Sequence, residues 1–214
     1  MTDAAMPTEP VTPWQALARD IAACTLCHEL AATRTRTVPG DLPRGQDVHR
    51  PHVPLLIVGE APGADEDRLG HPFVGRSGQL LDRVLGEASV PREAVAVVNV
   101  LKCRPPGNRT PEVAEVLACK PFLDRQLEIA NPGVILALGL SAAKRLLGGN
   151  PRLSDLRKVV HEFQGRPLIV TYHPSAALRE GGAGAITAAL REDIAAAVVV
   201  ARRREADRRA GESS

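Results

Sequence analysis

The stretch Leu55-Leu-Ile-Val-Gly59-Glu-Ala-Pro-Gly63 decides the fold class of this chain. Its first half is a short unbroken apolar run, which is typical of a strand buried on both faces. Its second half is a tight loop rich in glycine and proline. Similar apolar runs follow at 95–98, 134–138 and 168–171, and each is followed within two residues by asparagine, glycine or histidine.

Segments with a helical spacing of apolar residues alternate with these runs. They cover 77–88, a stretch that follows Thr110-Pro111 and includes Leu123, then 141–147 and 186–204. Continuous apolar strands that alternate with helices predict an α/β fold. We expect a central four-stranded parallel sheet with helices on both faces.

Ligands of such sheets bind beyond the carboxyl ends of the strands. The unusual residues of the chain lie at these ends, namely the loop 59–63, Asn99, Gly139 and His173-Pro-Ser175. Their convergence predicts a binding site on the pattern alone, before any family is considered.

The chain of 214 residues is long enough for one domain with its own core. We expect this domain to span 13–201 and to begin with a helix whose capping box pairs Thr12 with Gln15. A flexible N-terminus, 1–12, precedes it. The basic segment 202–214 has too few apolar residues for a core, so we expect a disordered tail, with an extension of the last helix as the alternative.

The composition excludes some classes of protein and leaves others open. No apolar run is long enough to cross a membrane, and 1–12 lacks the features of a signal peptide, so we expect a cytoplasmic protein. The net charge of +2 does not by itself indicate a nucleic-acid binder. Only four of the 27 basic residues are lysines. Arginine suits phosphate and base contacts, but a GC-rich genome would favour it equally.

Four cysteines without a secretion signal argue against a disulfide framework and leave a metal site or core packing. Cys24 and Cys27 are close in sequence, whereas Cys103 and Cys119 stand apart. A zinc site would more typically show two Cys-x-x-Cys pairs, and thiolates also suit an iron–sulfur cluster. The spacing alone does not choose between these metals.

Phe73 lies in the glycine-rich stretch 70–78 and is one of only five aromatic residues. An aromatic ring held between glycines in a loop is well placed to stack on a planar ligand such as a base. The alternative is a loop side chain that folds back onto the core.

These motifs together resemble the family 4 uracil-DNA glycosylases over roughly residues 14–200. The resemblance rests on the following stretches: Gly59-Glu-Ala-Pro-Gly63, Glu66-Asp67, Pro72-Phe-Val-Gly-Arg-Ser-Gly78, Asn99-Val-Leu-Lys-Cys-Arg-Pro-Pro-Gly-Asn-Arg-Thr-Pro111, His173-Pro-Ser-Ala-Ala-Leu178, and Cys24-Thr-Leu-Cys27 with Arg34 and Val38-Pro-Gly40. It implies a three-layer α/β/α sandwich, a [4Fe-4S] cluster with a structural role, and a monomer that hydrolyses the N-glycosidic bond of uracil in DNA.

The resemblance also implies roles for individual residues. The expected catalytic residues are His173, Glu60 and Ala61. Those expected to contact uracil are Gly59, Glu66, Phe73, Asn99 and His173. Those expected to contact DNA are Arg76, Ser77, Lys102, Arg109, Ser175, Leu178 and Arg179, with Leu178 or a neighbour filling the gap left by a flipped base. Those expected to hold the cluster are Cys24, Cys27, Cys103 and Cys119.

The chemistry of uracil release supports two of these roles. Uracil must leave the sugar as an anion, and a donor such as His173 aimed at its O2 stabilises the developing charge. Asn99 can accept from N3–H and donate to O4, whereas cytosine would mismatch both contacts at about 1–3 kcal/mol each. The alternatives are a structural histidine and an asparagine that closes a strand into a turn.

The position that holds a water-activating aspartate in the best-known glycosylase family is Ala61 here, so a dissociative mechanism is favoured over strong base catalysis. Glu60 is expected to hold the loop, and Glu66 is expected near the C5 edge of uracil, where it disfavours thymine. Two other functions compete. A UdgX-like group captures DNA covalently, but it has glutamine in the first motif and an inserted loop that this chain lacks. A catalytically inactive nucleic-acid-binding module would not need Asn99, Phe73 and His173 together.

Overall fold

The computed structural model describes residues 11–45 and 51–212. A single sheet has the strand order β2-β1-β3-β5-β4. Its strands are β1 (Leu55–Gly59), β2 (Ala96–Asn99), β3 (Val134–Leu138), β4 (Val160–Phe163) and β5 (Arg166–Thr171). β1, β2, β3 and β5 are parallel, which confirms the four expected strands.

The fifth strand, β4, is a correction to the expected four-stranded sheet. It pairs antiparallel with β5 through a turn at Gln164 and Gly165, which both have positive φ. Two such residues are typical of a tight hairpin turn. β4 lies at the edge and alternates between exposed and half-buried residues, so it lacks the continuous apolar run that marks the other strands.

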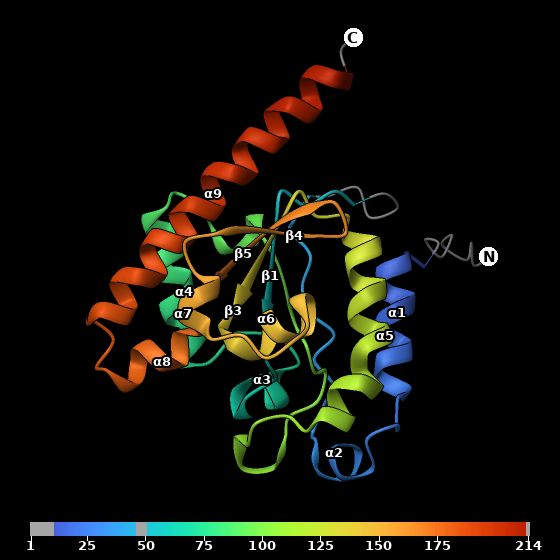
Figure 1. Cartoon of the computed structure of the whole chain (residues 1–214). Helices are drawn as coiled ribbons and strands as arrows, with labels where there is room; N and C mark the ends of the chain where they lie inside the picture. Colours follow the sequence, from blue (N-terminus) through green and yellow to red (C-terminus); the bar gives the residue numbers. More distant parts are fainter. Residues whose placement is uncertain (1–10, 46–50, 213–214) are drawn as a thin grey trace, which may run out of the picture.

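Helices cover both faces of the sheet, which confirms the three-layer α/β/α architecture (Figure 1). One face packs against α4 (Arg76–Glu87), α8 (Pro174–Arg179) and α9 (Ala185–Glu212). The other packs against α5 (Val113–Ala130), α6 (Gly139–Leu147) and α7 (Leu153–Leu156), with α1 (Pro13–Ala23) lying along α5. Alternate residues of each strand enter the two cores. Ile57 of β1 belongs to the first core, and its neighbour Leu56 belongs to the second.

Short elements surround the carboxyl end of the sheet. They are α2 (His28–Thr33), α3 (Ala64–Leu69) and the 3-10 helix η2 (Pro106–Asn108), while η1 (Arg92–Ala94) precedes β2. The expected capping box of α1 is present, since the Gln15 backbone N–H donates to Thr12 Oγ1 at 3.2 Å. The N-cap of α5 is Glu112.

The chain ends depart in part from the expectation. Most of the expected flexible N-terminus, residues 1–10, lies outside the described residues. The basic segment is helical up to Glu212 as the last turns of α9, which run beyond the sheet (Figure 1), so a disordered tail is not what the structure describes. Glu205 explains the helical order, because it pairs with Arg208, Arg209 and His52. Among the described helices, none is long and apolar enough to cross a membrane.

The start of the loop 41–53 covers an edge of the sheet. Asp41 and Val97 exchange two backbone hydrogen bonds of 2.9 Å, so this loop protects the free side of β2.

Candidate active site

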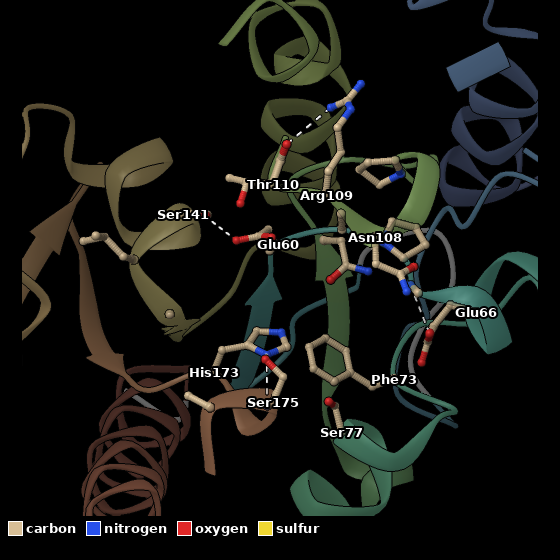
Figure 2. A pocket seen from close by; sticks show the side chains of 18 of the residues that line it. Glu60, Glu66, Phe73, Ser77, Asn108, Arg109, Thr110, Ser141, His173 and Ser175 are labelled. Carbon is tan, nitrogen blue, oxygen red and sulfur yellow. Dashed lines mark hydrogen bonds between the residues drawn. The ribbon is translucent and has the colours of Figure 1, made fainter. Parts of the chain in front are cut away.

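A pocket of about 570 Å³ lies at the carboxyl ends of β1, β2, β3 and β5, and we call it the strand-end pocket (Figure 2). It lies where the parallel sheet predicted a ligand site. Its wall includes most of the residues singled out in the sequence: Glu60, Ala61, Glu66, Phe73, Ser77, Asn99, Arg109, His173, Ser175 and Arg179.

Asn99 is the last residue of β2 and lines this pocket with a side chain that is only 2% exposed. Its Oδ1 is buried and has no hydrogen-bond partner among the described residues. An unsatisfied buried acceptor costs about 1–3 kcal/mol, so such a group in a pocket calls for a donor from a ligand. A ligand with an N–H group meets this requirement.

Phe73 and Gly59 fit tightly around Asn99. A Cβ on Gly59 would lie 2.3 Å from Asn99 Oδ1 and 2.6 Å from the Phe73 ring, so only glycine permits this close approach. Phe73 has a φ of 54°, an uncommon value for a residue with a side chain. The ring packs against the core and also lines the pocket.

His173 follows β5 and lies beside Phe73, with their ring centroids 5.6 Å apart (Figure 2). The Ser175 backbone N–H donates to His173 Nδ1 at 3.2 Å, and Ser175 Oγ lies 2.9 Å from the same atom. Since Nδ1 accepts, a neutral His173 carries its proton on Nε2. Burial, followed by the positive charge of Arg179, lowers the pKa of His173 to about 4. The side chain is therefore a neutral Nε2–H donor near pH 7.

The carboxylate of Glu66 ties two loops of the pocket together. Its Oε1 accepts from the backbone N–H groups of Val74 and Gly75, both at 2.9 Å, and its Oε2 accepts from Gly63 N–H at 3.0 Å. These bonds fix the loop that carries Phe73 against the loop 59–63. One of these bonds uses the backbone N–H of Gly75, which is the N-cap of α4.

Glu60 is held in a similar way, since Ser141 Oγ donates to its Oε2 (Figure 2). Ala61 lines the pocket beside it and has no polar group in its side chain. The contact with Ser141 joins the loop 59–63 to α6.

Arg109 lines the strand-end pocket but is paired with acidic residues. Its guanidinium donates to both oxygens of Glu115, at 2.7 and 3.0 Å, and to Glu29 at 2.8 Å. The hydrogen bonds to Glu115 and Glu29 raise the pKa of Arg109 above its usual range. The residue therefore anchors the loop after β2 to α5 and α2.

The four cysteines line a second pocket, which we call the cysteine pocket. They come from three separate segments, and the wall also includes Arg34, Leu101 and Lys102. Arg34 Nη1 donates to Cys103 Sγ at 3.1 Å. Burial, followed by the neighbouring sulfurs of Cys119 and Cys103, raises the pKa of Cys27 to about 11. Thiolates in this pocket therefore need nearby positive charge. Within the part of the chain described here, no three side chains of the usual ligand types converge on a single metal ion.

Comparison with known proteins decides the family. Residues 46–195 match the uracil DNA glycosylase superfamily. The type-4 uracil-DNA glycosylase of Sulfurisphaera tokodaii is 40% identical over 170 residues, which cover 74% of this chain and 73% of that protein. That of Thermotoga maritima is 43% identical over 160 residues, or 73% and 78% of the two chains. That of Pyrobaculum aerophilum is 48% identical over 136 residues, or 59% and 68%.

This chain belongs to the type-4 uracil-DNA glycosylases. The resemblance found in its motifs is thereby confirmed.

The residues expected to contact DNA differ in how far they are buried. Lys102 is 1% exposed and lines the cysteine pocket, so its side chain cannot reach DNA. Leu178 is half-buried against the core and does not line the strand-end pocket, whereas its neighbour Arg179 does. Arg76 is exposed at the first residue of α4, just outside the pocket wall.

Ser141 and Tyr172 are among the residues of the strand-end pocket that were not expected from the sequence. Tyr172 directly precedes His173, and the guanidinium of Arg157 lies 4.6 Å from the centre of its ring. Arg157 Nε in turn donates to Asp193 of α9 at 2.7 Å. The rarity of aromatic residues in the chain could have drawn attention to Tyr172. Ser141 carried no such signal, because its contact with Glu60 joins residues 81 positions apart.

Proposed function

We propose that this protein hydrolyses the N-glycosidic bond of uracil in DNA and releases free uracil, leaving an abasic site. The observation that carries the proposal is the unpaired, buried Asn99 Oδ1 in the strand-end pocket, which is also lined by neutral His173. An acceptor and a donor of this kind match the edge of uracil. The type-4 uracil-DNA glycosylases in the comparison support the same reaction.

Recognition of the base depends on Asn99. Its Oδ1 accepts from uracil N3–H, which satisfies the buried acceptor, and its amide donates to O4. Cytosine has no hydrogen on N3 and carries a donor at C4, so both contacts would be unpaired at about 1–3 kcal/mol each. Phe73 stacks on the base, and Gly59 leaves the space for this close fit.

Release of uracil depends on His173. Ser175 holds its Nδ1, so the Nε2–H is the group available to donate to uracil O2 as negative charge develops there. A neutral donor, whose low pKa follows from burial and from Arg179, stabilises the leaving anion without itself losing a proton. The sugar develops positive charge as the bond breaks, and water then attacks its anomeric carbon.

The pocket offers little for strong base catalysis. Ala61 has no polar group, and Glu60 is bonded to Ser141. The reaction therefore depends chiefly on stabilisation of the leaving group. We assign Glu66 the positioning of the Phe73 loop through its three backbone contacts, in place of the contact with the C5 edge expected from the sequence.

DNA contacts are assigned to the pocket rim. Ser77, Ser175 and Arg179 line the pocket, and Arg76 is exposed next to Ser77, so these residues are placed to hold phosphates around a flipped nucleotide. Because Leu178 packs against the core, Arg179 replaces it in our proposal as the residue that fills the gap. Arg109 positions its loop. The protein is further proposed to act as a monomer in the cytoplasm.

We further propose that Cys24, Cys27, Cys103 and Cys119 hold a [4Fe-4S] cluster with a structural role. Four cysteine thiolates are the usual ligand set of such a cluster, and all four cysteines line the cysteine pocket. Arg34 and Lys102 line the same pocket and supply positive charge to the thiolates. Such a cluster, when bound, joins three segments of chain by metal–thiolate bonds.

The proposal is tested with an oligonucleotide that contains one uracil. Incubation with the protein followed by alkali should cut the strand at that position, whereas a cytosine-containing strand should stay intact. A DNA adduct that survives denaturing electrophoresis would indicate covalent capture instead. Binding without cleavage would indicate an inactive nucleic-acid-binding module. Either result would contradict the proposed hydrolysis.

A further inference from the structure

Lys102 is a fully buried lysine between the two pockets. Its side chain is 1% exposed and lines the cysteine pocket, and its Nζ donates to the backbone carbonyl of Asn99. A buried ammonium is costly unless it is paired and hydrogen-bonded. The position of this charge therefore needs a physical reason, and contact with DNA does not provide it.

The cysteines are the groups that could balance the charge of Lys102. In the described part of the chain Lys102 makes no ion pair with a carboxylate, and Cys103 and Cys119 line the same pocket. The Lys102 backbone N–H also hydrogen-bonds to the thiol of Cys119. Thiolates that hold a metal centre would supply the compensating charge, whereas four neutral thiols would not.

Lys102 also contacts the peptide bond between Asn99 and Val100. Its carbonyl accepts from Lys102 Nζ, and its N–H, which belongs to Val100, donates to Gly59 O at 2.9 Å. Both polar groups of the Asn99–Val100 peptide are therefore fixed. Because the Asn99 side chain makes no hydrogen bond through Oδ1, its direction depends on how firmly this backbone is held.

We propose that Lys102 is a positioning residue that orients Asn99 toward uracil and that its buried charge is stabilised by the thiolate centre. The cysteines then contribute to recognition of uracil as well as to stability, and they do so through the side chain of Lys102. This inference rests on the proposed function, because it assumes both the loaded centre and the role of Asn99.

The test compares Lys102→Met, which keeps the chain length without the ammonium, with Lys120→Met. Lys120 follows Cys119 directly, but its side chain is 52% exposed and paired with Asp124, so it serves as a matched control. Equilibrium binding of free uracil and of DNA with an abasic-site analogue is measured on protein with equal iron content. Release of iron to a chelator is followed in parallel.

Loss of one hydrogen bond to a charged donor should weaken uracil binding in Lys102→Met by about tenfold or more. Affinity for abasic DNA should stay at the wild-type level, because that ligand offers nothing to Asn99. Iron should be lost faster, since the thiolates lose a compensating charge. Lys120→Met should match the wild type in all three measurements.

Wild-type uracil binding in Lys102→Met would overturn the inference, as would a parallel fall in affinity for uracil and abasic DNA, which would mark a structural residue. If Lys102→Met does not fold, Lys102→Gln is measured in the same way, and failure of both to fold would also overturn it. Wild-type protein that binds no uracil and cuts no DNA would contradict the proposed function itself. If the wild type cuts uracil-containing DNA and Lys102→Met binds uracil as well as the wild type does, only this inference is contradicted.

Discussion

The strand-end pocket and the cysteine pocket share the segment 99–103 but are built differently. The first collects the ends of four parallel strands, and its key acceptor, Asn99 Oδ1, is left without a partner. The second collects α1, α2 and α5 with this segment, and its sulfurs are surrounded by apolar side chains and cations. A buried acceptor without a partner indicates a site for a ligand that binds and leaves. Four sulfurs from three segments indicate a site for a permanently bound metal centre.

This difference predicts that damage to the cysteine pocket affects mainly stability. Cys103→Ala should lose iron and lower the free energy of unfolding by more than about 4 kcal/mol, because loss of a metal centre removes the bonds that join three segments. Uracil recognition by the fraction that stays folded should weaken by no more than in Lys102→Met, because the centre reaches Asn99 only through Lys102. Iron analysis, thermal unfolding and the oligonucleotide assay measure these effects. Stoichiometric zinc without iron in anaerobically purified wild type would contradict the cluster assignment.

Damage to the donor of the strand-end pocket should instead affect the chemical step. His173→Ala should lower the single-turnover excision rate by on the order of 10²–10³, because one preorganised donor to the leaving anion is lost. DNA affinity should stay close to the wild-type value, since this contact strengthens only in the transition state.

Two variants sharpen this test of His173. His173→Asn should recover part of the rate because it retains a donor. His71→Ala serves as the control, since the His71 side chain is 64% exposed and outside the pocket. A normal rate in His173→Ala, or an equal loss of rate and affinity, would make His173 a structural residue.

A smaller effect is expected at the acceptor that reads the base. Asn99→Asp should slow uracil excision by roughly 10- to 100-fold, because it removes the donor to O4 and brings a negative charge near the leaving anion. It should also permit some cytosine excision, because the cytosine amino group then meets an acceptor. Asn131→Asp, at the exposed C-cap of α5 and outside this pocket wall, is the matched control and should stay near the wild-type rate. Unchanged uracil turnover in Asn99→Asp would disprove the recognition role.

The smallest effect concerns the pH dependence of stability. An unfolded histidine takes up a proton near pH 6.5, whereas burial and Arg179 lower the pKa of His173 to about 4 in the folded protein. Between these values the unfolded state binds more protons, so the free energy of unfolding falls as the pH decreases from 6.5 to 4. Thermal unfolding should show a weaker fall in His173→Asn than in the wild type. The single-turnover rate should stay level from about pH 5.5 to 8, where His173 is neutral. Equal acid sensitivity of both proteins would contradict the low pKa.

Much of the strand-end pocket was predictable because its residues stand directly after strands. Asn99 follows the run 95–98 and His173 follows the run 168–171, so a parallel sheet necessarily brings them to one edge. The edge strand β4 was not predictable in this way, because it is partly exposed and has no continuous apolar run. The turn residues Gln164 and Gly165 were the one local signal for it.

The sequence by itself determined the α/β class, the edge of the sheet that carries the site, and the family. These depend on apolar periodicity and on motifs within a few residues of each other. Only the tertiary structure decided that Lys102 faces the cysteines rather than DNA, that Glu66 is bound by three backbone N–H groups, and that Leu178 packs against the core. The direction and burial of a side chain depend on neighbours from distant segments, and the local pattern of a sequence does not encode them.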